Sequence, residues 1–117
     1  MEIKDWQALF DGKTTKDWKT EGQVSVEDGI LKIGGDQGGS IVTTATFARG
    51  FVRWSVRQAG QAKAKIIWRG EEYPLNDNRQ GWTSFEWEPE TKGESPIRIV
   101  APPGTTIWIR EFAFRPY

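Results

Sequence analysis

The side chains of this chain that are able to act on a ligand are carboxylates, basic groups, hydroxyls and an unusual number of indoles. Seven tryptophans occur in 117 residues, with 16 acidic and 16 basic residues, and there is no histidine or cysteine. Without these two residue types there is no Ser–His or Cys–His catalytic pair, no thiolate nucleophile and no ordinary zinc site. Indole rings stack on flat ligands, and the guanidinium and carboxylate groups of arginine and the acids form hydrogen bonds with hydroxyl groups. This inventory favours a sugar as the ligand.

The acidic and basic residues are segregated along the chain. Residues 37–70 contain six basic residues and no acid, whereas residues 71–90 contain six acids and one arginine. Two neighbouring strands whose charges pair across a sheet would give this pattern, and the alternative is a basic face for an anionic ligand. We favour cross-strand pairing, because the two blocks match in size.

Chain length, net charge and the absence of long apolar segments limit the classes of protein to which this chain can belong. A length of 117 residues fits one compact domain spanning residues 1–117. Its net charge of zero points to neither nucleic acid nor membrane as a partner. The first ten residues contain no apolar run typical of a signal peptide, and no segment is long and apolar enough to cross a bilayer.

An alternation of apolar and polar residues predicts the elements that position these groups. Period two is clear over residues 51–57, 64–69 and 82–88, and further strands are expected over 40–46, 97–101 and 106–115. Asp28-Gly29 suits a tight turn between residues 23–27 and 30–33. The sequence therefore predicts an all-β, antiparallel sandwich or barrel of about eight strands.

The last strand contains an irregularity in its alternation. Ile107 and Ile109 share one phase, whereas Phe112 and Phe114 have the opposite phase. One extra residue near Arg110-Glu111 would return all four side chains to the core, so we expect a β-bulge there.

The alternation also divides core residues from residues on an open face. The predicted buried set is Val52, Trp54, Val56, Ala64, Ile66, Trp68, Phe85 and Trp87. The residues predicted to share the open face are Arg53, Arg57, Lys65, Arg69, Trp82, Ser84, Glu86 and Glu88. Arginines, glutamates and one indole suit a sugar site, with Arg53, Arg57, Arg69 and Trp82 as ligand-binding residues. The alternative is a solvated ladder of ion pairs with one packed tryptophan.

Two further groups of side chains could form a catalytic or metal site. Glu86 and Glu88 would lie about 7 Å apart on one strand face, a spacing compatible with an inverting glycosidase pair but common to any two such residues. The segment Glu71-Glu72-Tyr73 with 76–78 offers oxygens to a hard cation such as calcium. A solvent-exposed turn is the better interpretation of that segment, so we expect no metal and no cofactor.

Several segments resemble the 3-keto-disaccharide hydrolase family. The opening Leu-Phe-Asp-Gly-Lys of residues 9–13, Trp18 and the Val-Glu-Asp-Gly-Ile-Leu of residues 26–31 are similar to the start of that family. The similarity continues through residues 39–43, 47–54, 65–70 and the final strands, while the segment from Gly70 to Pro96 looks shortened.

The resemblance implies a concanavalin-like jelly-roll sandwich that acts on a carbohydrate or 3-oxo-glycoside, usually outside the cytoplasm. A ketone acidifies the neighbouring C–H bond, so a general base suffices for cleavage, and Tyr73, Glu86 or Glu88 would have to serve. The alternatives are a binding module without the catalytic segment, or a module that pairs through its sheet edges. We expect Arg69→Ala to weaken binding without lowering the melting temperature.

Overall fold

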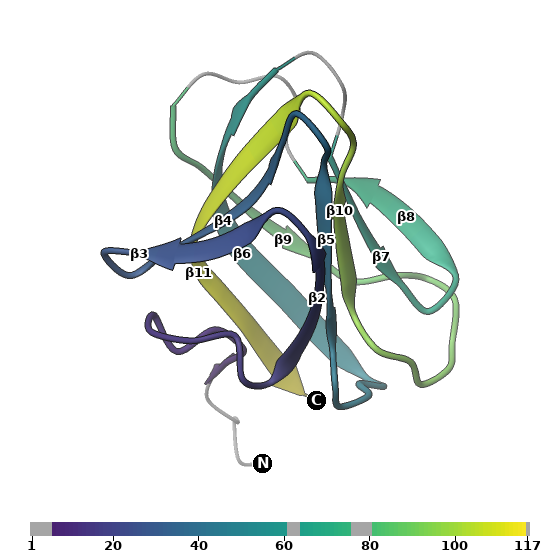
Figure 1. Cartoon of the computed structure of the whole chain (residues 1–117). Coiled ribbons are helices and arrows are strands. Elements are labelled where there is room, and N and C mark those ends of the chain that lie inside the picture. The colour runs from purple at the N-terminus through teal and green to yellow at the C-terminus, as the bar shows by residue number, and fades with distance from the viewer. Residues whose placement is uncertain (1–5, 61–63, 76–80, 117) are drawn as a thin grey trace.

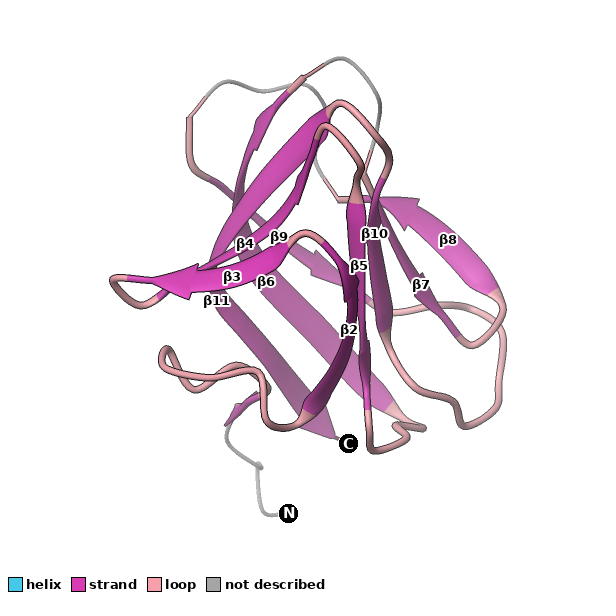
Figure 2. Cartoon of the chain, in the orientation of Figure 1, coloured by secondary structure: helices cyan, strands magenta, loops and turns pink. Residues whose placement is uncertain are grey.

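Two antiparallel β-sheets pack face to face in the computed structural model, which describes residues 6–60, 64–75 and 81–116 (Figure 1). This part of the chain contains 11 strands and no helix, more strands than the predicted eight (Figure 2). The predicted all-β jelly-roll sandwich is confirmed, and the higher count reflects short strands such as β1 (Gln7–Ala8) and β8 (Glu71–Pro74). Within the described residues, no helix is long and apolar enough to cross a membrane.

The first sheet has the strand order β3-β4-β11-β6-β9, and β1 pairs with β11. Its remaining strands are β3 (Val24–Glu27), β4 (Ile30–Gly35), β6 (Gly50–Ala59), β9 (Thr83–Trp87) and β11 (Thr105–Pro116). The second sheet has the order β2-β5-β10-β7-β8. Its other strands are β2 (Trp18–Gly22), β5 (Gly39–Thr43), β7 (Lys65–Trp68) and β10 (Arg98–Ala101).

The core between the two sheets consists of the alternating apolar residues that the sequence predicted to be buried. Val52, Trp54, Val56, Ala64, Ile66 and Trp68 are at most 1% exposed, and Phe85 and Trp87 pack against this core half-buried. Both buried indoles also donate hydrogen bonds: Trp54 Nε1 to the Leu75 carbonyl at 2.9 Å and Trp68 Nε1 to the Phe47 carbonyl at 3.0 Å. Each large ring therefore fills the core without leaving its N–H unpaired.

Two predicted local features are confirmed. The register between β11 and β6 shifts between Ile109 and Glu111, so Arg110 is the extra residue of a β-bulge, and Ile109 and Phe112 both face the core. The β3–β4 hairpin turns at Asp28-Gly29, whose φ angles of 52° and 76° are those expected for a tight turn.

Candidate functional site

The outward side chains of β6, β9 and β11 form one continuous polar and aromatic surface, which we call the Arg–Trp face. In the strand register, Arg53 lies opposite Glu86, and Arg57 lies opposite Trp108. Ser55 lies between them, with Ser84 on one side and Glu111 on the other. Alternation in three adjacent strands thus places these side chains in neighbouring rows on the outer side of the first sheet, where Ser55 is only 2% exposed.

Three arginines of the Arg–Trp face lie over indole rings. The Arg57 guanidinium carbon lies 4.4 Å from the ring centroid of Trp108 and 5.9 Å from that of Trp82. The Arg110 guanidinium lies 4.4 Å from the same Trp82 ring. These distances are those of cation–π contacts, which hold the arginine side chains in defined positions on an otherwise exposed surface.

The third stacked arginine lies beside a hollow. The Arg53 guanidinium lies 4.3 Å over the Trp6 ring, so this arginine packs on the N-terminal segment. Next to it is a hollow of about 360 Å³. The residues that line it are Arg53, Trp54, Ser84, Phe85, Glu86 and Glu111. Two carboxylates and one guanidinium therefore border a single depression.

The structure brings together four of the seven site residues that the sequence predicted. Arg53, Arg57, Trp82 and Glu86 all belong to the Arg–Trp face. Three further members, Trp108, Arg110 and Glu111, were not predicted from the sequence. A signal for them was present, because Trp108 alternates with two core isoleucines and the predicted bulge makes two consecutive residues point outward.

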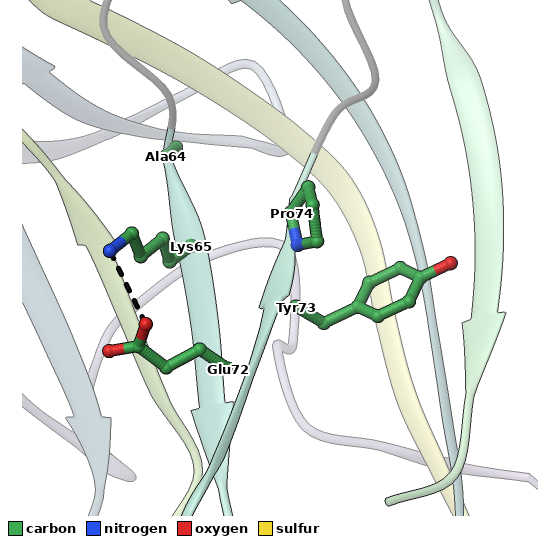
Figure 3. Close-up of a pocket in the computed structure, with 5 residues that line it drawn as sticks. All are labelled: Ala64, Lys65, Glu72, Tyr73 and Pro74. Carbon is green, nitrogen blue, oxygen red and sulfur yellow. Dashed lines mark hydrogen bonds and ion pairs between the residues drawn. The ribbon is translucent and has the colours of Figure 1, made fainter.

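Lys65 does not lie on the Arg–Trp face, and its assignment to a common open face was wrong. It belongs to β7 in the second sheet, where its Nζ lies 3.3 Å from Glu72 Oε2 on β8 (Figure 3). The predicted cross-strand charge pairing is confirmed for this pair of residues, whereas Arg53 and Arg57 lie over indole rings. Alternation alone does not determine which of two sheets a strand joins, so outward residues of opposite sheets were grouped together.

Arg69 likewise does not point to an open face. It follows the last residue of β7 and has a φ of 52°, which interrupts the alternation and turns the side chain inward. The residue is only 7% exposed. Its Nη1 donates to the Ala48 carbonyl at 2.9 Å and its Nη2 to the Pro89 carbonyl at 2.7 Å. Arg69 thus connects three loops as a buried structural group, contrary to its predicted place in the ligand site.

The predicted catalytic candidates do not form one site. Glu86 lines the hollow, whereas Glu88 is half-buried beyond the end of β9 and does not line it. Tyr73 lies at the edge of the sandwich, where its ring stacks on Trp87 with centroids 5.3 Å apart. In Figure 3 the Tyr73 side chain points away from the Lys65–Glu72 pair. Trp87 faces the core and Glu86 faces outward, so Tyr73 and Glu86 lie on opposite sides of the first sheet.

Glu71, Glu72 and Tyr73 belong to strand β8, which pairs with β7, so the prediction of a solvent-exposed turn there was wrong. The Glu71 carboxylate accepts hydrogen bonds from Thr91, and these bonds hold the pKa of Glu71 below its ordinary value of 4.5. They tie the start of β8 to the loop after β9. Residues 76–78, the other part of the predicted cation loop, lie outside the described residues. In the described part of the chain, no cluster of three acidic residues is arranged to hold a metal ion.

Known structures share this fold. A variant of the family 29 carbohydrate-binding module CBM29-2, solved with cellulohexaose, aligns over 97% of this chain and 92% of its own, with a TM-score of 0.73 and 13% identity. The module CBM29_1 from Piromyces equi aligns over 98% of this chain and 88% of its own, with a TM-score of 0.59 and 13% identity. These likenesses establish the sandwich fold.

A protein from Parabacteroides distasonis, named as a glycosyl hydrolase, aligns over 96% of this chain and 94% of its own, with a TM-score of 0.72 and 12% identity. Comparison with curated proteins gave no match. A family model described as the 3-keto-alpha-glucoside-1,2-lyase-like domain matches residues 5–102, which is most of the chain. The chain therefore belongs to the family of 3-keto-disaccharide hydrolase domains.

Proposed function

We propose that this domain binds a glycoside on the Arg–Trp face. The observation that carries the proposal is the row of guanidinium groups held on indole rings over the outer surface of β6, β9 and β11. Held in place, these groups offer directed donors to sugar hydroxyls at little cost in side-chain entropy. The family and the shared fold of carbohydrate-binding modules support the same ligand class.

The arrangement suits a sugar chain lying along the face. Trp82 and Trp108 supply apolar ring surface at one end, where Arg57 is placed between them. Arg53, Glu86 and Glu111 supply donors and acceptors in the hollow at the other end. A sugar with hydroxyls on its edges and C–H groups on its faces meets both kinds of contact.

Titration calorimetry with a panel of oligosaccharides tests this proposal. Trp82→Ala and Arg57→Ala should each weaken binding about tenfold, since each removes a stacking or charge-assisted contact. Lys65→Ala is the matched control, because Lys65 is an exposed base on the outer surface of the second sheet. Equal losses in all three variants, or binding unchanged by Trp82→Ala and Arg57→Ala, would place the ligand elsewhere.

A second candidate function is elimination across a 3-oxo-glycosidic bond, favoured by the two carboxylates beside Arg53 in the hollow. Glu86 would take the proton from C2, which the ketone at C3 acidifies. The electron pair forms the C1–C2 double bond as the C1–O bond breaks, and the departing oxygen takes a proton from solvent or Glu111. The Arg53 guanidinium would stabilise the negative charge on the C3 oxygen.

Incubation with a 3-keto-glucoside, followed for release of the leaving group, tests this second function. Glu86→Gln should abolish turnover but leave binding intact, and Glu88→Gln serves as its control because Glu88 does not line the hollow. Turnover that persists in Glu86→Gln and is lost in Glu88→Gln or Tyr73→Phe would identify one of the other predicted bases instead.

A further inference from the structure

The layer that a ligand meets on the Arg–Trp face consists largely of guanidinium groups. Trp6, Trp82 and Trp108 each carry an arginine with its guanidinium carbon 4.3 or 4.4 Å from the ring centroid. A neutral sugar stacks through its C–H face directly on an indole. Here an arginine lies over one face of each ring, so a ligand that also binds guanidinium makes contacts that stacking alone does not provide.

The N–H edges of these arginines are available to such a ligand. A guanidinium that lies over a ring uses its flat face for that contact, and its donors point outward in its plane. Among the described residues, Arg53, Arg57 and Arg110 donate no hydrogen bond to the protein. Arg69 provides the contrast, since its donors are bound to the carbonyls of Ala48 and Pro89.

Positive charge is concentrated at one end of the face. Lys32 lies opposite Trp108 in the register of β4 and β11, so it joins Arg57 and Arg110 around the Trp82 and Trp108 rings. Of the two glutamates of the face, Glu86 lies at the other end, opposite Arg53, and Glu111 lies in the row between, opposite Ser55, so the three basic side chains outnumber the acidic ones around these two rings. The chain as a whole has zero net charge, so this local excess is specific to the surface.

We propose that the ligand is an acidic glycan, and that a uronic acid carboxylate binds between Arg57 and Arg110 at the Trp82 end of the face. This inference rests on the proposed glycoside-binding function. A carboxylate is planar and matches the fork of a guanidinium with two parallel hydrogen bonds. The carboxylate of a uronic acid also projects from the edge of the sugar ring, so a ring lying along the face brings it to the N–H edges.

Calorimetric titration with an oligogalacturonate and with cellohexaose of equal length tests the inference. The oligogalacturonate should bind at least about tenfold more tightly than cellohexaose. Raising the salt concentration from about 20 mM to about 500 mM should weaken the binding of the oligogalacturonate but not that of cellohexaose. Arg57→Ala and Arg110→Ala should each lower uronate affinity by about tenfold more than they lower cellohexaose affinity, because only the uronate loses a charge-assisted contact in addition to hydroxyl contacts. Arg57→Lys should restore only part of the loss, because lysine keeps the charge without the fork. Melting temperatures equal to the wild type would confirm that the variants are folded.

The outcomes separate this inference from the proposed function. Equal affinity for the two glycans would overturn the acidic ligand and leave glycoside binding intact. Binding of neither glycan would overturn both. If a sulfated oligosaccharide of equal charge binds more tightly than the uronate, the group that binds the two arginines is a sulfate ester, and the inference of a carboxylate is wrong. Lys65→Ala is the control for nonspecific charge effects, and a loss in Lys65→Ala equal to that in Arg57→Ala would refute a site on this face.

Discussion

Replacing Arg69 by alanine should destabilise the fold strongly, although the residue is a charged side chain beside a turn. The residue is 7% exposed, and its guanidinium donates to the carbonyls of Ala48 and Pro89 at 2.9 and 2.7 Å. It also lies 4.5 Å over the ring of Trp68, in the core. Alanine removes both donors and leaves two loop carbonyls without their partner.

The expected size of the effect follows from these contacts. A carbonyl left unpaired in a buried place costs about 1–3 kcal/mol, so two of them cost about 2–6 kcal/mol. The Arg69 Nε is buried without a partner, which already lowers the stability of the wild type and offsets part of this loss. We therefore expect a loss of about 3 kcal/mol, and a melting temperature lower by about 10–15 °C.

Thermal melting followed by circular dichroism, together with urea titration, measures this loss. Arg57→Ala is the matched control, since its exposed guanidinium makes cation–π contacts worth only about 0.5–1 kcal/mol. Arg69→Lys should be intermediate, because a single ammonium does not span both carbonyls as a fork does. If Arg69→Ala melts as Arg57→Ala does, the carbonyls are satisfied by water, and the structural role assigned to Arg69 is wrong.

Three further changes test the core, a buried hydroxyl and the carboxylate at the start of β8. Trp68→Ala should lower the free energy of unfolding by about 3–5 kcal/mol through a core cavity, measured by urea titration against Trp82→Ala on the surface. Thr43→Val should cost about 1–3 kcal/mol in the same titration, because the buried Thr43 hydroxyl accepts from the Ile97 amide at 2.9 Å. The pKa of Glu71 is lowered in the folded protein, so its contribution to stability should be present above pH 4.5 and be lost as the pH falls. Glu71→Gln should flatten that fall in an acid-melting series; an unchanged pH profile would contradict the assignment.

Strand alternation determined which side chains enter the core, and for that reason it predicted most of the fold. The change in alternation between Ile109 and Phe112 also located the bulge. Apolar side chains on both sides of such a change can face the core only if the strand contains one extra residue. Alternation carries no information about pairing between distant strands. The chain leaves β6 in the first sheet and enters β7 in the second, so Arg53 and Lys65 point to opposite sides of the molecule.

The candidate site was predicted only where it depends on regular strands. Arg53, Arg57 and Glu86 keep the alternation and were placed together correctly. Arg69 lies one residue beyond a strand, where a positive φ decides the direction of its side chain. Nothing in the spacing of residues 64–69 signals that angle. The contact between Arg53 and Trp6 is equally invisible in the sequence, since it joins segments far apart along the chain.

The bulge in β11 adds one residue to the strand without changing which side chains of the strand face the core. Deleting Arg110 would leave Ile109, Glu111, Phe112 and Phe114 in one regular alternation, with the same apolar side chains facing inward. The extra residue therefore adds nothing to the interior and appears only on the outside, where its guanidinium covers Trp82. A one-residue gain or loss at this position changes the exposed surface while the interior stays the same. Domains that differ by this single residue would share a core but not a ligand.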